Sequence, residues 1–283
     1  MQVSFTVMQT LSRRFLLVPS LSDKACAQTA LCLLGRSGGV RGDGVIFYEC
    51  ERLENGASLF GASEYTAMGE RVPLSADGAR VLGAFLHRSD KELPPTLRIL
   101  SEGTIRCVTQ KEGAQDTLWS VNLPAPTFDP KRVGLRDKTP LLGQRVPVGQ
   151  SALPFYALAL DAPYTVTFQF GVPLFDLRPA SIALPLSVSG LLTRPFCTVF
   201  AEVTGDESLS LRLFDPELGE LDASSDGAAA ATAAAHLLGL LPIACDLRAK
   251  MRGGTLFVRA DCLGAPMTVT ADVRHCFDGR TEI

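Results

Sequence analysis

The sequence has no excess of basic residues, no long apolar run and no closely paired cysteines. Its 27 lysines and arginines face 30 aspartates and glutamates, a formal net charge of −3. A general nucleic-acid-binding protein needs a basic face to neutralise phosphates, so this balance argues against that class. The apolar segment 228–241 is interrupted by Thr232 and His236 and is shorter than the roughly 20 residues that span a bilayer. Because the N-terminus also lacks the basic-then-apolar layout of a signal peptide, we expect a cytoplasmic protein that binds neither nucleic acid nor membrane.

The cysteines argue against a structural metal. None forms a C-x-x-C pair, the spacing typical of zinc ribbons and fingers. Most lie in apolar runs, such as 30–34 and 243–245, so we expect small buried residues in a reducing compartment. None lies at a Gly-rich helix start, where a thiolate would be stabilised. The eight cysteines are Cys26, Cys32, Cys50, Cys107, Cys197, Cys245, Cys262 and Cys276.

Hydrophobic periodicity predicts many strands and few helices. Alternation of apolar and polar residues predicts half-buried strands, and shorter β-rich runs predict others. Such runs with one long helix in each half favour an α+β fold. The Pro-containing stretch 124–147 is predicted to be a linker or domain edge. The predicted strands lie at 3–7, 15–18, 45–49, 118–123, 164–170, 208–213, 256–259 and 267–271, and the predicted helices at 23–34, 78–87 and 227–241.

A short motif occurs once in each half of the chain. The segments 75–79 (SADGA) and 224–228 (SSDGA) are 149 residues apart, and each precedes a helix-forming run. Each run carries a histidine 12 residues after the serine, His87 and His236. The shared motif, offset and placement indicate an internal duplication.

The N-terminus of a helix is a natural site for an anion. Its first backbone N–H groups have no partner within the helix, the helix dipole adds positive charge, and glycine permits close approach. Two such termini facing each other across a cleft could hold one carboxylate and serve proton removal on one face and delivery on the other. An alternative is that Asp77 and Asp226 only cap their helices, at about 1 kcal/mol each. His87 and His236 are more typical of packing or surface positions than of ligands.

Six segments, in order along nearly the whole chain, carry a family resemblance. Residues 8–18, 42–49 and 75–80 (SADGAR) are similar to the motifs M-H-G-L-G-N-D-F with its strand, A-D-G-L-L-L-L-E and C-G-N-G-A-R of the diaminopimelate epimerase family. Residues 214–226, 237–241 and 273–279 are similar to its Y-E-R-G-V-G-E-T-L-A-C-G-T, the end of its second helix and its closing strand A-E-x-V-F-E-G. The wider superfamily includes the phenazine-biosynthesis isomerases and proline racemases.

The resemblance implies an α+β fold of two pseudo-symmetric domains, each a mixed or antiparallel sheet around a central helix. The N-terminal domain would comprise residues 1–123 and 271–283, and the C-terminal domain residues 124–270. The resemblance also implies an active site at the two helix N-termini, no organic cofactor, no metal and a possible homodimer.

The chain departs from the family where its chemistry resides. Ser75 and Ser224 stand at the positions of the two catalytic cysteines. A thiol can act as a base near neutral pH, whereas a hydroxyl needs an adjacent base. A two-thiol racemisation is therefore excluded. Arg13, Val172 and the pair Asp215-Pro216 replace the family's substrate-reading Asn, Asn and Glu-Arg, so diaminopimelate is not the expected substrate.

Carboxylates take the matched positions instead. Asp77 and Asp226 each lie two residues after their serine, and a partly desolvated carboxylate can exchange protons near neutral pH. We therefore predict that Asp77 and Asp226 move protons while Ser75 and Ser224 orient the substrate. Arg13 or Asp215 would recognise the periphery of a ring. The predicted carboxylate-binding groups are the backbone N–H groups around Ala76, Gly78, Ala79, Ser225, Gly227 and Ala228.

These assignments predict a cofactor-independent isomerase. It would shift a proton and a double bond in a small unsaturated cyclic amino or imino acid, as in the alkylproline pathways of antibiotic biosynthesis. The alternative is a catalytically inactive epimerase paralogue that binds a ligand or a partner, because both cysteines are lost.

Overall fold

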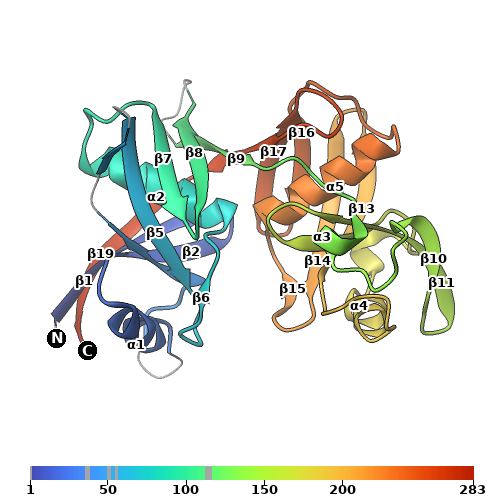
Figure 1. Cartoon of the computed structure of the whole chain (residues 1–283), viewed down its shortest axis with the longest axis horizontal. Helices are drawn as coiled ribbons and strands as arrows, with labels where there is room; N and C mark the ends of the chain where they lie inside the picture. Colours follow the sequence, from blue (N-terminus) through green and yellow to red (C-terminus); the bar gives the residue numbers. More distant parts are fainter. Residues whose placement is uncertain (1, 36–38, 50–51, 55–56, 112–116) are drawn as a thin grey trace. The chain divides into compact units, whose positions relative to one another are not determined.

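The computed structural model describes residues 2–35, 39–49, 52–54, 57–111 and 117–283. The chain forms two compact units. Unit 1 comprises Met1–Asn122 and Thr270–Ile283, and unit 2 comprises Leu123–Val269. Each unit contains one long helix packed against a mixed sheet, α2 (Ala76–Ser89) in unit 1 and α5 (Ser225–Leu237) in unit 2 (Figure 1). The predicted α+β class with two domains, each a sheet with a central helix, is confirmed.

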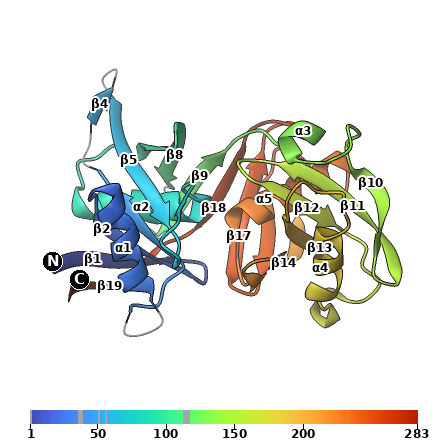
Figure 2. The ribbon, with the colours of Figure 1, turned by 60° about the horizontal axis from the view of Figure 1, so that its bottom comes forward.

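In unit 1, α2 packs against β1, β2, β3 and β8, and α1 packs against β3 and β5 (Figure 2). The strands pair in the order β19-β1-β2-β3-β5-β7-β8-β9, with β2–β3 and β5–β7 parallel and the other pairs antiparallel. The first and last strands are neighbours, so the two chain ends lie side by side. The elements are β1 (Gln2–Thr10), β2 (Arg13–Pro19), α1 (Asp23–Leu34), β3 (Gly44–Tyr48), β4 (Arg52–Glu54), β5 (Ala57–Tyr65), β6 (Arg71–Val72), β7 (Thr96–Ser101), β8 (Thr104–Gln110), β9 (Leu118–Leu123) and β19 (Arg274–Glu282).

In unit 2, α5 packs against β11, β12, β13, β14 and β17. The strands pair in the order β10-β11-β12-β13-β14-β16-β17, with β12–β13 and β14–β16 parallel and the other pairs antiparallel. The elements are α3 (Pro130–Val133), β10 (Leu142–Val148), β11 (Ser151–Ala159), β12 (Pro163–Thr167), the 3₁₀ helix η1 (Leu174–Asp176), α4 (Ala180–Ser187), β13 (Cys197–Gly205), β14 (Ser208–Asp215), β15 (Gly219–Leu221), β16 (Leu247–Met251) and β17 (Gly254–Ala260). Strand β18 (Met267–Asp272) begins in unit 2 and ends in unit 1.

The two units repeat one connectivity. The series β1-β2-β3-β5-β7-β8 in unit 1 and β11-β12-β13-β14-β16-β17 in unit 2 has the same sequence of antiparallel and parallel pairs. The registers also agree, since Glu64 pairs with Val72 in the β5–β6 hairpin and Leu213 pairs with Leu221 in the β14–β15 hairpin. Equivalent residues are 149 positions apart, as in the sequence motif. The repeat seen in the sequence is thus a repeat of the fold.

The central helices are buried for different reasons. Every residue from Ala228 to Ala235 is buried, because alanine and threonine side chains let strands approach the helix backbone closely. Helix α2 carries the larger buried side chains Val81 and Leu82. Beside them, a Cβ at Gly83 would lie 2.5 Å from Val108 Cγ1, so only glycine permits this packing.

Two local expectations were wrong, and a third was right in part. The last predicted helix ends at Leu237 instead of residue 241, where Gly239 adopts a left-handed φ of 65°. The stretch 124–147, predicted to be a linker or domain edge, begins just after the boundary between the units, and it contains α3 and most of β10. The strand predicted over 164–170 ends at Thr167, and α4 follows despite its internal Pro185.

The cysteines also differ from expectation. Cys50 lies outside the described residues, and the other seven are free. Of those seven, Cys26 alone is buried, whereas Cys32, Cys262 and Cys276 are exposed. An apolar sequence neighbourhood did not predict burial, because the strand and helix faces alternate between core and solvent. Within the described residues, no helix is both long and apolar enough to cross a membrane.

Candidate functional site

The matched serines are the N-caps of α2 and α5. Ser75 Oγ accepts a hydrogen bond from the Gly78 N–H at 3.0 Å, and Ser224 Oγ accepts one from the Gly227 N–H at 3.0 Å. Both serines have extended backbone conformations, as N-caps require. The hydroxyls therefore do the capping that the alternative interpretation gave to the aspartates.

Four of the backbone groups predicted to bind an anion are already bonded inside their helices. The Gly78 and Gly227 N–H groups bond to the serine side chains. The Ala79 N–H bonds to the Ser75 carbonyl at 2.9 Å, and the Ala228 N–H to the Ser224 carbonyl at 3.0 Å. These bonds count against an anion-binding role for the four groups, and that role stays a prediction. Ala76 and Ser225 are fully buried, and their role stays a prediction.

Asp77 is the centre of a buried ion cluster. Its side chain is fully buried, with Oδ1 2.9 Å from Arg80 Nη1 and Oδ2 3.2 Å from Arg13 Nη1. The same Arg80 nitrogen is 3.2 Å from Thr10 Oγ1, and Arg80 is fully buried as well. Each carboxylate oxygen of Asp77 therefore lies beside a guanidinium group. These ion pairs count against the proton-transfer role of Asp77, which stays a prediction.

Arg13 lies at the solvent side of this cluster. Its side chain is 23% exposed, and its guanidinium lies 4.8 Å above the ring centre of Phe15. Burial opposes its charge, but attraction to Asp77, Glu64 and Asp43 outweighs this effect and raises the pKa of Arg13. Arg13 is thus a permanent, partly accessible cation.

The matched aspartate in unit 2 has different surroundings. Asp226 is half-buried, whereas Asp77 is fully buried. Position 229, three residues further along α5, is alanine where α2 has Arg80. On α2, Asp77 and Arg80 form a buried ion pair. The equivalent positions on α5 are Asp226 and Ala229, which cannot form such a pair.

A residue that sequence reasoning missed, Glu64 on β5, contacts the N-cap serine of α2. Its Oε2 accepts hydrogen bonds from the Ser75 N–H at 2.8 Å and from Ser75 Oγ at 2.9 Å. A Cβ at position 78 would lie 2.6 Å from this oxygen, so Gly78 makes room for the carboxylate. Glu64 is 5% exposed. Burial raises its pKa, against the attraction of Arg13 and the bonds from Ser75, and nearby Asp77 raises it further.

The equivalent position in unit 2 is apolar. Leu213 on β14 lies 11 residues before Ser224, as Glu64 lies 11 residues before Ser75. A Cβ at Gly227 would overlap the Leu213 side chain, so Leu213 occupies the place that Glu64 has in unit 1. The equal offset was the signal that could have drawn attention to Glu64.

Asp215 has a local structural contact. Its Oδ1 accepts hydrogen bonds from the N–H groups of Glu217 at 2.8 Å and Leu218 at 3.0 Å. These bonds hold the turn between β14 and β15. Ring recognition by Asp215 stays a prediction.

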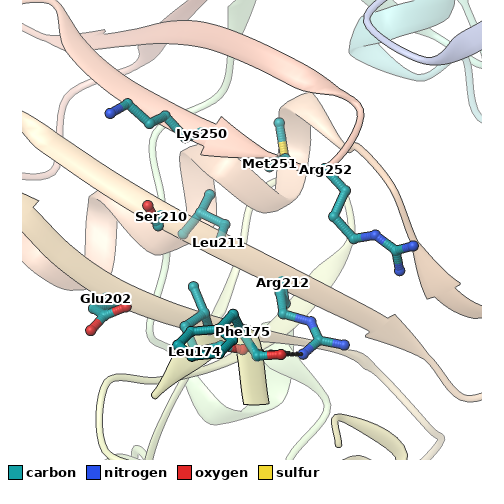
Figure 3. Close-up of a pocket in the computed structure, with 9 residues that line it drawn as sticks. All are labelled: Leu174, Phe175, Glu202, Ser210, Leu211, Arg212, Lys250, Met251 and Arg252. Atoms are coloured by element: carbon teal, nitrogen blue, oxygen red, sulfur yellow. Dashed lines mark hydrogen bonds between the residues drawn. The ribbon is translucent and has the colours of Figure 1, made fainter. Parts of the chain in front are cut away.

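A separate pocket of about 560 Å³ lies within unit 2 (Figure 3). Arg212, which lines the pocket, is held by other protein groups. Its Nε and Nη2 donate hydrogen bonds to Glu220 at 2.7 and 2.9 Å, and its Nη1 donates one to the Leu174 carbonyl at 3.1 Å. None of the predicted site residues lines it. The lining residues are Leu174, Phe175, Glu202, Ser210, Leu211, Arg212, Lys250, Met251 and Arg252. Among the described residues, no cluster of His, Cys, Asp and Glu could hold a metal ion.

Individual known proteins match nearly the whole chain. No family model matches it. The diaminopimelate epimerase of Nitrosomonas eutropha is 25% identical over 295 residues, covering 100% of both chains. A second diaminopimelate epimerase, from Xylella fastidiosa strain M23, is 27% identical over 97% of this chain and 95% of its own.

Solved structures share the fold at low sequence identity. A hydroxyproline epimerase from Agrobacterium vitis with bound trans-4-hydroxy-L-proline has a TM-score of 0.70 at 10% identity, covering 99% of this chain and 91% of its own. A PhzF-family phenazine biosynthesis protein from Bacillus anthracis has a TM-score of 0.66 at 10% identity, with 100% of both chains covered. A methylitaconate-delta-isomerase has a TM-score of 0.64 at 10% identity, covering 99% and 95%. The chain is thus similar over its full length to diaminopimelate epimerases, and it shares its fold with a hydroxyproline epimerase, a PhzF-family protein and a methylitaconate-delta-isomerase.

Proposed function

We propose that this protein is a small-molecule isomerase that moves a proton without an organic cofactor. The observation that carries the proposal is the set of groups at the N-terminus of α2. The Ser75 hydroxyl bonds to a buried carboxylate at 2.9 Å, and two guanidinium groups flank Asp77 at 2.9 and 3.2 Å. Proton transfer next to a substrate carboxylate needs these types of group: a base, an orienting donor and a cation.

The residues present favour a double-bond shift over racemisation of a simple amino acid. With serine at both cysteine positions, a carboxylate has to carry the proton, because a hydroxyl is a much weaker acid than a thiol. A carboxylate is a weak base and suits a carbon already acidified by conjugation. We infer that the substrate is an unsaturated cyclic amino or imino acid, as in alkylproline-type natural-product pathways. The hydroxyproline ligand of one neighbour and the isomerase name of another support this substrate class.

The proposed roles follow the surroundings of each group. Asp226, which is half-buried, keeps the proton-transfer role proposed from the sequence. Asp77 instead holds Arg80 and Arg13 in place through its two oxygens. Arg13, partly exposed and permanently charged, would bind the substrate carboxylate. Ser224 orients the substrate as a hydrogen-bonding group.

Exchange in deuterated water tests the proposal. Unsaturated cyclic imino acids are incubated with the protein, and carbon-bound deuterium is followed by NMR. We expect the wild type to catalyse exchange and Asp226→Asn to lose about 10²–10⁴-fold in rate. Asp261→Asn is the matched control, because this exposed carboxylate pairs on the surface with Arg259 and should exchange at the wild-type rate. Binding of the acids without any exchange would instead support the inactive paralogue.

A further inference from the structure

The buried Glu64 carboxyl is held on one side only. Both hydrogen bonds from Ser75 go to Oε2, at 2.8 and 2.9 Å. Within the described part of the chain, Oε1 receives no hydrogen bond, although Glu64 is 5% exposed. A carboxylate with one oxygen oriented and the other available has the geometry of a general base.

Neighbouring charges act on the pKa of Glu64 in opposite directions. From β2, the Arg13 guanidinium attracts the carboxylate, and from α2, the Asp77 carboxylate repels it. Ser75 stabilises the ionised form through its two hydrogen bonds, whereas burial favours the neutral form. Burial outweighs the other effects and leaves the pKa of Glu64 raised. Such a carboxyl can both accept and return a proton nearer to neutral pH than an exposed glutamate can.

The fold repeat shows that the contact between this strand and the helix N-terminus forms without a carboxylate. Leu213 occupies the equivalent place in unit 2, against Gly227 of an equally well-formed helix N-terminus. The N-cap bond is 3.0 Å in both units. Since the helix forms with leucine there, the costly burial of Glu64 calls for another explanation than folding.

We propose that Glu64 is a catalytic proton-transfer residue of the isomerase and that Ser75 positions it. This inference rests on the proposed function. The substrate C–H bond breaks, its proton forms an O–H bond at Oε1, and the electron pair of the C–H bond moves the double bond along the substrate. Asp226, the proton-transfer group of the proposed function, delivers a proton to the far carbon of the allylic system, and the O–H bond at Oε1 then breaks as that proton returns to solvent, so that no oxidant or reductant is needed.

The first test is Glu64→Gln. The glutamine carbonyl oxygen can still accept both Ser75 bonds, so the fold is retained, but the side chain cannot take a proton. We expect a loss of about 10²–10⁴-fold in deuterium exchange with an unchanged circular dichroism spectrum. Exchange at the wild-type rate in this variant, while wild type is active, would overturn the role of Glu64 and leave the proposed function standing.

The second test compares Ser75→Ala with Ser224→Ala. Each variant removes one N-cap hydroxyl, and the Ser75 hydroxyl also bonds to a carboxylate. We expect Ser75→Ala to move the acidic limb of the pH–rate profile to higher pH, because the ionised Glu64 loses a donor. Ser224→Ala should leave the position of that limb unchanged. An equal effect of both variants on the limb would assign Ser75 a capping role only.

A third readout does not depend on activity. The ¹³C resonance of the Glu64 carboxyl, assigned with Glu64→Gln, is titrated in the wild type and in Ser75→Ala. The ordinary pKa of glutamate is about 4.3. We expect Glu64 to titrate at a higher pH than this, and at a still higher pH in Ser75→Ala. Ordinary titration that is unmoved by Ser75→Ala would overturn the inference even if no substrate were found. Absence of exchange by the wild type would instead count against the proposed function.

Discussion

The ion cluster of α2 predicts a large and specific effect of Arg80→Met on the stability of unit 1. Arg80 and Asp77 are both fully buried and lie 2.9 Å apart. Removing one partner of a buried pair leaves an uncompensated charge and typically costs about 3–5 kcal/mol. Asp77 keeps Arg13 at 3.2 Å, so we expect the lower end of this range. Methionine replaces the apolar stem of Arg80, so little of the loss arises from a cavity.

The assay follows unit 1 alone. Trp119 is the single tryptophan, lies in β9 of unit 1 and is 2% exposed. Its fluorescence during urea unfolding therefore reports this unit. With a slope of about 1–3 kcal/mol per molar urea, a loss of about 3 kcal/mol lowers the midpoint by roughly 1–3 M.

A double-mutant cycle gives the critical comparison. Asp77→Asn alone leaves Arg80 buried with a neutral partner, and Asp77→Asn with Arg80→Met removes both charges of the pair. We expect the double variant to be at least about 1 kcal/mol more stable than the sum of the single losses predicts. Strict additivity, or a loss below about 1 kcal/mol in Arg80→Met, would refute the argument that this pair organises the helix N-terminus.

Further predictions concern the caps, the helix packing and pH. Ser75→Ala and Ser224→Ala should each cost about 1 kcal/mol in urea unfolding, because each removes the acceptor of an N-cap bond of 3.0 Å; a loss near zero in both would show that these caps contribute nothing. Gly227→Ala should cost about 1–3 kcal/mol, since its Cβ would overlap Leu213, and adding Leu213→Ala should reduce the penalty of the glycine substitution; an unchanged penalty would place the strain elsewhere. Burial lowers the pKa of His236, so the unfolded chain takes up a proton first and the stability that this neutral side chain contributes is lost as pH falls below about 6.5. His236→Gln should flatten this part of the pH dependence, measured by circular dichroism at several urea concentrations, and an identical pH dependence in both proteins would contradict the assignment.

Local sequence patterns predicted the helices and the repeat because their causes are local. Serine followed by a glycine three residues later, Ser75 with Gly78 and Ser224 with Gly227, is a capping pattern complete within one turn. The offset of 149 residues between the two motifs made the halves comparable from the order of their residues alone. The end of α5 was less predictable, because leucines after residue 237 fit a helix and a turn equally well.

The charge arrangement at the N-terminus of α2 depended on the tertiary structure. Whether Asp77 caps a helix, moves a proton or pairs with Arg80 and Arg13 depends on which side chains other elements bring to it. Glu64 reaches Ser75 because the pairing of β5 with β3 and β6 sets which face of the strand each residue occupies, and a shift of one residue would turn the carboxylate to the opposite face. Short-range propensity decides where a helix begins, whereas long-range strand register decides which carboxylate meets it.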